Sequence, residues 1–255
     1  MTNLGVIILA AGKGTRMKSD LVKVLHPVAG TPMLALTLNL ARNLRPDRIA
    51  VVVGFQRHLV HEQFGAEDLL FVDQKEQLGT GHAVLTASPV FKNFRGTVLI
   101  LCGDVPLLTE KTIKRFLEFH KEEGNTLSVL TTRLEDPTGY GRIFRGKKGE
   151  LLRIVEQKDL PAGEDAIREI NTGIYCVEAR FLFKALTGLS NQNAQREFYL
   201  TDIVASASSQ GEKAAAYLAE DPMEVMGINT RLDLAKASRY LLRKMAERHM
   251  PEGQP

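Results

Sequence analysis

An apolar run near the N-terminus that ends abruptly in a cationic loop constrains the fold more than any other feature. The run, Val6–Ala11, is about one strand long, and it is followed at once by Gly12, Lys13, Gly14 and Arg16. α/β proteins commonly use such a buried strand and glycine-containing loop to present backbone N–H groups to a phosphate. The stretch therefore predicts an α/β protein whose first strand leads into a phosphate-binding loop.

The first half of the chain alternates between strand-like and helix-like stretches. Buried strands are predicted at 49–53, 69–72 and 98–101, and helices at 32–44, 56–64, 79–88 and 109–123. This alternation indicates right-handed βαβ units. We therefore expect a doubly wound, mostly parallel mixed sheet flanked by helices, which binds ligands beyond the carboxyl ends of its strands.

The second half has fewer helices between its predicted strands. Strands are expected at 127–131, 142–144, 151–155, 170–177 and 214–218, and helices at 180–186, 200–210 and 230–248. Because few helices separate these strands, we expect a mixed sheet layered onto the first one. Residues 251–255 are expected to form a frayed tail.

Composition restricts the class of protein and the class of partner. The chain has 255 residues, of which 44% are hydrophobic and 25% charged, and its net charge of +3 is too small to indicate a nucleic-acid partner. Cys102 and Cys176 give neither a disulfide framework nor a CxxC metal motif. With no signal-peptide pattern and no apolar run of about 20 residues, we expect a soluble cytoplasmic protein without a membrane partner.

Two common phosphate-binding motifs do not match the loop. The dinucleotide fingerprint GxGxxG fails because Met17 stands at the third glycine, and because the second strand ends in Gly54 without an acid for a ribose hydroxyl. The P-loop pattern GxxxxGK[ST] fails on its spacing. What remains is a glycine loop that lets a ligand approach the backbone closely. Arg16 and Lys23 would neutralise the negative charge that grows as a phosphoanhydride bond breaks. The alternative is a tight turn with solvated lysines.

Other reactive side chains lie in sequence patterns that indicate a function less specifically. Asp104 follows Gly103 at the end of a predicted strand and is the natural ligand for Mg²⁺, although a helix cap is an equal alternative. His58 and His61 share a helix face without a third metal ligand, so we interpret them as surface residues. Cys102 has no neighbouring histidine and is interpreted as a small wall residue.

A series of further motifs resembles one known family. In chain order they are Leu9–Met17, Lys23–His26, Gln77–Ala83, Gly103–Leu107, Asp136–Ile143, Ile154–Asp159, Glu169–Ile174, Asn191–Gln195 and Gly227–Arg231. They resemble the uridyltransferase (pyrophosphorylase) domain of the bacterial bifunctional N-acetylglucosamine-1-phosphate uridyltransferase/glucosamine-1-phosphate acetyltransferases. The first motif is shared by many sugar nucleotidyltransferases, whereas the later ones in this order are far more specific.

The resemblance implies the domain organisation and the site residues. It implies a nucleotidyltransferase domain at 1–228, with a nucleotide-binding half at about 1–110 and a sugar-binding half at about 111–228, and a helical arm at 229–255. Arg16 and Lys23 would be catalytic cations, and Asp104 and Asn229 would bind Mg²⁺. The implied substrate-binding residues are Leu9, Ala10, Ala11, Gly12, Lys23, Gln74, Gly79, Thr80, Cys102, Gly103, Asp104, Gly141, Glu156, Asn171 and Asn229.

The resemblance also implies which part of the substrate each group of residues binds. Gln74 and the Gly79–Thr80 backbone would read the uracil, and Gly141, Glu156 and Asn171 would contact the acetamido sugar. From residue type alone, Glu156 and Asn171 would be assigned to ordinary surface or turn positions.

The implied reaction forms UDP-N-acetylglucosamine and pyrophosphate from UTP and N-acetylglucosamine 1-phosphate. The sugar phosphate attacks the α-phosphorus of UTP in line, and it is already anionic, so no general base is needed. Two alternatives stay open. One is a uridylyl- or thymidylyltransferase for another sugar 1-phosphate such as glucose 1-phosphate, and the other is a catalytically silent nucleotide-sugar binding module.

The sequence departs from the family pattern at three places. The family has a tyrosine at the position of Cys102 and a proline at the position of Val22. The acetyltransferase half of that family, a left-handed β-helix, has no counterpart after Arg231. Because the relatives form trimers chiefly through that half, the resemblance leaves the oligomeric state of this chain open.

The predicted C-terminal helix combines an apolar stripe with a basic face. The stripe consists of Leu234, Leu241 and Met245, and the basic face includes Arg231 and Arg239. We interpret the helix as an arm that packs by its stripe and leaves the cations solvated. A basic amphipathic helix that binds a membrane or a partner is the alternative.

Overall fold

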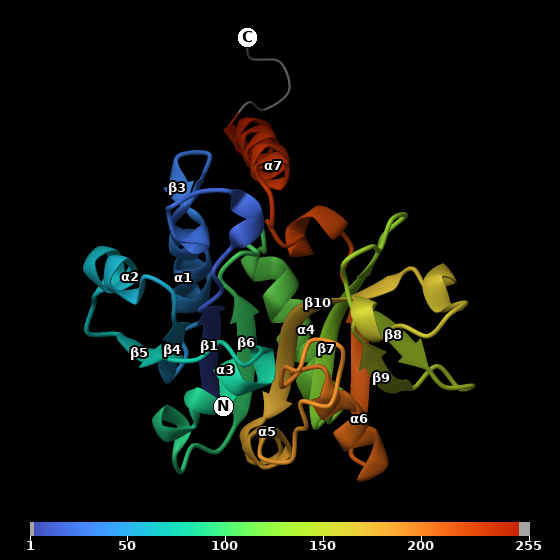
Figure 1. Cartoon of the computed structure of the whole chain (residues 1–255). Coiled ribbons are helices and arrows are strands. Elements are labelled where there is room, and N and C mark those ends of the chain that lie inside the picture. Colours follow the sequence, from blue (N-terminus) through green and yellow to red (C-terminus); the bar gives the residue numbers. More distant parts are fainter. Residues whose placement is uncertain (1–2, 250–255) are drawn as a thin grey trace.

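Nine strands of the chain build one sheet with helices on both faces (Figure 1). The computed structural model describes residues 3–249. The strands are β1 (Leu4–Ala10), β4 (Arg48–Val53), β5 (Leu69–Asp73), β6 (Thr97–Cys102), β7 (Leu127–Arg133), β8 (Arg142–Arg145), β9 (Leu151–Val155), β10 (Glu169–Glu178) and β11 (Ala214–Leu218). Their main path is β11–β7–β10–β6–β1–β4–β5, and β8 pairs with both β10 and β9.

The helices divide between the two faces of the sheet. Helices α1 (Met33–Asn43), α2 (Arg57–Phe64) and α4 (Glu110–Glu122) pack on one face, and α3 (Thr80–Thr86), α5 (Ala179–Leu186) and α6 (Asp202–Ser209) pack on the other. Ile8 of β1 therefore faces one apolar layer and Ile7 faces the other, and both are fully buried. Because both faces of β1 are buried, its sequence is a continuous run of apolar residues. The doubly wound fold predicted from the sequence is confirmed.

The parallel part of the sheet places the glycine loop beside a second strand end. β1 pairs in parallel with β4 and with β6, and Leu9 lies opposite Cys102 in the register. The loop after β1 and the Gly103–Asp104 turn after β6 are therefore neighbours at the carboxyl edge of the sheet, the usual ligand-binding edge.

The second half of the chain joins this sheet instead of forming another layer. β10 lies between β6 and β7 and is antiparallel to both, and β11 continues in parallel from β7. The expected second sheet layered onto the first is therefore wrong. Strand ladders are built from backbone groups, so any strand with a free edge can accept a neighbour from either half of the chain.

Short elements and helix ends differ slightly from expectation. β2 (Pro27–Val28) and β3 (Thr31–Pro32) form a small hairpin that the sequence did not predict, with positive φ at both turn residues, Ala29 and Gly30. α3 is shorter than expected and is followed by a separate 3-10 turn (Ser88–Phe91) that contains Pro89. Other 3-10 turns are Thr15–Met17, Lys23–Leu25, Gln157–Asp159, Glu164–Ala166 and Pro222–Val225.

The last helix, α7 (Arg231–His249), lies across the loop side of the fold (Figure 1). Leu234 and Leu241 pack with Tyr240 in a small cluster that includes Met33. Met245 is 48% exposed, so its predicted place in the packed stripe is wrong. The predicted tail, 251–255, lies outside the described residues. No helix in the described part of the chain is long and apolar enough to span a membrane.

Candidate active site

The loop after β1 contains two glycines with different structural roles. A Cβ on Gly12 would meet no atom within 4 Å, so the space above this residue is open to a ligand. Gly14 has a φ of 64°, and a Cβ there would lie 2.5 Å from Cβ of Lys23. Gly14 therefore allows the chain to turn tightly against Lys23. Gly12 leaves room for a ligand to approach the backbone closely.

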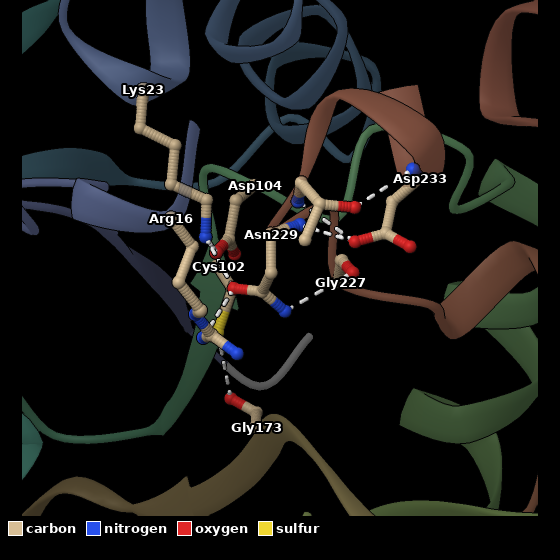
Figure 2. A network of polar contacts seen from close by, with 9 residues as sticks. Arg16, Lys23, Cys102, Asp104, Gly173, Gly227, Asn229 and Asp233 are labelled. Atoms are coloured by element: carbon tan, nitrogen blue, oxygen red, sulfur yellow. Dashed lines mark hydrogen bonds and ion pairs between the residues drawn. The ribbon is translucent and has the colours of Figure 1, made fainter. Parts of the chain in front are cut away.

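One cavity beside the loop gathers the predicted cations, and we name it the cation cavity. It has a volume of about 330 Å³ and is lined by Leu9, Ala10, Gly12, Gly14, Thr15, Arg16, Lys23, Val24, Asp104 and Asn229. The Lys23 ammonium pairs with the Asp104 carboxylate and donates to Oδ1 of Asn229 at 2.8 Å. Arg16 Nη2 donates to the same oxygen at 2.9 Å. Figure 2 shows these four side chains pointing toward one another.

The surroundings of Lys23 and Asp104 argue against the two alternatives drawn from the sequence. Lys23 is only 9% exposed and has two oxygen partners, so it is not a solvated lysine. The cap of α4 is Thr109, whose hydroxyl accepts from the Thr112 N–H at 3.2 Å. Asp104 is thus free to face the cavity.

Asp104 and Asn229 fit a small hard cation. Their oxygens converge on one positive centre, the Lys23 ammonium, although Asn229 is 206 residues away from Lys23 in the chain. Within residues 3–249, no group of three or more His, Cys, Asp or Glu side chains could hold a metal. Mg²⁺ needs no such group, because it typically combines one or two carboxylates with waters and phosphate oxygens.

A second cavity that also borders the loop contains the buried side-chain amide of Gln74, and we name it the glutamine cavity. It has a volume of about 300 Å³ and is lined by Leu9, Ala11, Gly12, Lys13, Gln74, Gln77, Gly79, Thr80, Ala83 and Glu197. Gln74 is 3% exposed, and its Nε2 donates to the Gly79 carbonyl at 3.1 Å and lies 3.0 Å from His82 Nδ1. The side-chain oxygen of Gln74 has no hydrogen-bond partner among residues 3–249 and can accept from a ligand.

Gly79 shapes this cavity through its backbone. It has a φ of 109°, and a Cβ on it would lie 2.6 Å from the carbonyl oxygen of Phe198, so a larger residue would not fit. Thr80 uses its hydroxyl to accept the Leu200 N–H at 3.0 Å. The hydroxyl of Thr80 therefore connects α3 to the segment before α6.

Three further predicted residues meet at the start of β10, and we name this group the carboxylate corner. The N–H of Asn171 donates to the carbonyl of Gly141 at 2.9 Å, and a Cβ on Gly141 would lie 3.5 Å from Oε2 of Glu156. Oδ1 of Asn171 accepts from the Gly173 N–H at 3.0 Å. The fold thus brings Gly141, Glu156 and Asn171 together from three separate segments.

The carboxylate corner is rich in hydrogen-bond acceptors. Burial raises the pKa of Glu156, and the neighbouring Asp202, Asp159 and Glu197 raise it further. Thr201 partly offsets this by donating to Oε1 of Glu156 at 3.2 Å. Such a corner suits a ligand with several hydroxyl donors.

Cys102 and Gly103, both predicted to bind substrate, line neither the cation cavity nor the glutamine cavity. Sγ of Cys102 donates to the Gly173 carbonyl at 3.4 Å, and burial raises the pKa of the thiol, with the charge of Asp104 adding to the effect. The thiol therefore stays protonated and is no nucleophile. The N–H of Gly103 donates to the Leu9 carbonyl at 2.9 Å and so joins the two strand ends.

Some residues at the site were not singled out from the sequence. His82, which contacts Gln74, lies inside a quoted motif but had no assigned role. Arg231 is exposed, as expected for the solvated face of the last helix, but its guanidinium also donates to the carbonyls of Met17 and Lys18, which the sequence did not predict. His58 and His61 are exposed, as expected for surface residues.

Comparisons with known proteins show the family of this chain and relatives that resemble it. A family profile described as nucleotidyl transferase matches residues 5–225. The bifunctional protein GlmU of Geobacter metallireducens is 52% identical over 254 residues, covering 99% of this chain and 53% of that protein. GlmU of Pelobacter propionicus is 54% identical, covering 96% and 54%, and GlmU of Desulfotalea psychrophila is 47% identical, covering 93% and 70%. The chain spans about half the length of the first two relatives.

A solved structure shares the whole fold. A UDP-glucose pyrophosphorylase complexed with UDP-glucose matches with a TM-score of 0.77 and 17% identity, covering 96% of this chain and 100% of that one. At this identity the likeness establishes the fold alone, a mostly parallel mixed sheet flanked by helices.

Proposed function

This chain belongs to the nucleotidyl transferase family, and we propose that it forms UDP-N-acetylglucosamine and pyrophosphate from UTP and N-acetylglucosamine 1-phosphate with Mg²⁺. One observation carries the proposal. The cation cavity and the glutamine cavity share Leu9 and Gly12, so a single loop would border both the phosphate site and the base site of a nucleotide. The resemblance to the uridyltransferases supports the choice of UTP and of the acetamido sugar.

The reaction is a direct displacement at phosphorus. A phosphate oxygen of the sugar phosphate attacks the α-phosphorus of UTP, a new P–O bond forms, and the bond to the β-phosphate oxygen breaks. The electron pair of that bond leaves with pyrophosphate. The attacking oxygen is anionic, so no side chain has to remove a proton, which agrees with the protonated thiol of Cys102.

The cation cavity would stabilise the charge that grows as the phosphoanhydride breaks. Arg16 presents a planar guanidinium with several donors, and Lys23 presents a nearly buried ammonium. Both cations are held by the side-chain oxygen of Asn229, so they would stabilise such charge with little reorganisation. The space where a side chain of Gly12 would stand is open, so phosphates would approach the backbone N–H of this residue.

Asp104 and Asn229 would hold the metal ion. Bound there, Mg²⁺ would supply positive charge to the phosphate oxygens. Because Lys23 pairs with both oxygens, its ammonium would have to shift toward the phosphates when a metal binds.

The two remaining regions would select the substrates. In the glutamine cavity, the free carbonyl oxygen of Gln74 would accept the N–H of uracil. In the carboxylate corner, Glu156 would accept from sugar hydroxyls, and the amide of Asn171 could donate to the acetamido carbonyl. A base with a different hydrogen-bonding edge would leave the Gln74 oxygen unpaired.

A panel of nucleoside triphosphates and sugar 1-phosphates, measured by pyrophosphate release, tests this proposal. We expect UTP with N-acetylglucosamine 1-phosphate to react fastest and to require Mg²⁺. Faster reaction with glucose 1-phosphate, or with dTTP, would show a different nucleotidyltransferase specificity. Tight UDP-sugar binding in calorimetry without Mg²⁺-dependent turnover would show a silent binding module.

A further inference from the structure

The first turn of α7 holds the backbone of Asn229. Oδ2 of Asp233 accepts from the N–H groups of Asn229 at 3.1 Å and of Thr230 at 2.8 Å, and the Thr230 hydroxyl accepts from the Asp233 N–H at 3.1 Å. This is a reciprocal capping box in which aspartate replaces the usual glutamate. The helix cap thereby fixes the residue whose Oδ1 receives both cations of the cavity.

The same turn also holds the glycine loop. Arg231 donates from Nε to the Met17 carbonyl at 3.1 Å and from Nη2 to the Lys18 carbonyl at 3.2 Å. Met17 ends the 3-10 turn that carries Arg16, and Lys18 follows it with a φ of 47°. Carbonyls at the end of such a turn have no partner within it, so Arg231 satisfies them from a distant part of the chain.

The contacts of Arg231 and of Asp233 hold the two partners of one hydrogen bond. Arg16 lies on the loop, Asn229 lies just before the helix, and the bond between them is 2.9 Å long. Figure 2 shows Asp233 beside Asn229 on the side away from Arg16. Arg16 itself is exposed, so its own packing does not fix its position.

We propose that Arg231 and Asp233 are positioning residues that set the geometry of the cation cavity by clamping the loop and Asn229 to the first turn of α7. The kinetic consequences rest on the proposed function, whereas the clamp itself does not. A misplacement of about 1 Å in a phosphoryl-transfer site costs on the order of a hundredfold in rate. The packing of α7 against the glycine loop and the turnover rate are therefore coupled.

Amide hydrogen exchange tests the clamp without any substrate. Arg231→Ala should speed exchange in residues 12–18 at least fivefold, and Asp233→Ala should speed exchange at Asn229 and Thr230. Arg239→Ala is the matched control, because Arg239 is an exposed arginine of the same helix without a hydrogen bond or ion pair among the described residues. Exchange in 12–18 that is equal in the Arg231 and Arg239 variants overturns the proposal.

Kinetics test the consequence for the site. We expect Arg231→Ala to lower kcat roughly ten- to a hundredfold and to raise the Mg²⁺ concentration needed for half-maximal rate. Arg231→Lys, which keeps the charge but not the two-point geometry, should fall between Arg231→Ala and the wild type. Wild-type kcat and Mg²⁺ dependence in Arg231→Ala overturn the coupling. If the wild-type chain releases no pyrophosphate, the proposed function fails, and the exchange result alone decides the clamp.

Discussion

Replacing Asp104 by asparagine removes a charge that the structure places in two roles. The carboxylate pairs with Lys23, and the side chains of Asp104 and Lys23 are 28% and 11% exposed. Losing an exposed pair costs about 0–1 kcal/mol, and breaking a buried one costs about 3–5 kcal/mol. For this partly buried pair we expect the free energy of unfolding to fall by about 1–3 kcal/mol. The loss is below that of a fully buried pair because Lys23 keeps its hydrogen bond of 2.8 Å to the Asn229 oxygen. In a chain of this size, this loss lowers the Tm by about 2–6 °C.

The same substitution removes an anionic ligand from the proposed metal site. Turnover should fall roughly a hundred- to a thousandfold, and half-maximal rate should require more Mg²⁺. Pyrophosphate release over a Mg²⁺ series, together with thermal unfolding, measures both effects. Asp68→Asn is the matched control, since Asp68 pairs with Arg42 on the surface with side chains 48% and 38% exposed. The control should keep wild-type turnover and lose less than about 1 kcal/mol.

Either half of this prediction can fail independently. A wild-type rate at limiting Mg²⁺ would remove Asp104 from the metal site. A Tm that falls no further than in Asp68→Asn would show that the pair with Lys23 contributes no more than a surface ion pair does.

Three further changes have distinct expected outcomes. Arg16→Ala should lower turnover on the order of a hundredfold in a protein that still folds, because one donor to the growing charge is lost. A loss of stability with full activity per folded molecule would instead show a purely structural loop. Burial lowers the pKa of His120 from 6.5 to about 4, so the unfolded chain binds a proton that the folded chain excludes, and stability should fall as the pH drops from about 6.5 toward 4. In urea unfolding, the free energy of unfolding should fall by about 2 kcal/mol more between pH 7 and pH 5 in the wild type than in His120→Gln. An equal dependence of the free energy of unfolding on pH in the two proteins would contradict this. Within residues 3–249, no hydrogen bond of normal geometry reaches the buried Tyr175 hydroxyl, so Tyr175→Phe should keep or raise the free energy of unfolding by up to about 1 kcal/mol in thermal unfolding. A loss larger than that would show that the hydroxyl is bonded.

Individual elements could be predicted because their signals lie in consecutive residues. The β-branched run predicted a strand at 49–53, and β4 spans Arg48–Val53. Thr109 predicted the start of a helix, and its hydroxyl does cap α4. Apolar periodicity and capping are local properties, so short windows of sequence contain them in full.

The site could be predicted only in part from the residues alone. Arg16, Lys23 and Asp104 were indicated because they follow predicted strands at the edge where α/β sheets bind ligands. Glu156 and Asn171 came only through the family resemblance, since such residues are mostly exposed in proteins. Their hydrogen-bonded surroundings exist only after β8, β9 and β10 have paired.

The sequence by itself determined the kind of each longer helix and strand, the glycine loop after the first strand and the charged side chains beside it. The tertiary structure alone decided that β10 runs antiparallel between β6 and β7, and that the second half of the chain shares one sheet with the first. It also decided that Arg231 holds the loop carbonyls 213 and 214 residues away. Backbone ladders form between any suitably placed strands, and a contact between distant residues leaves no periodic trace in sequence. Only the folded chain brings such residues within hydrogen-bonding distance of the glycine loop.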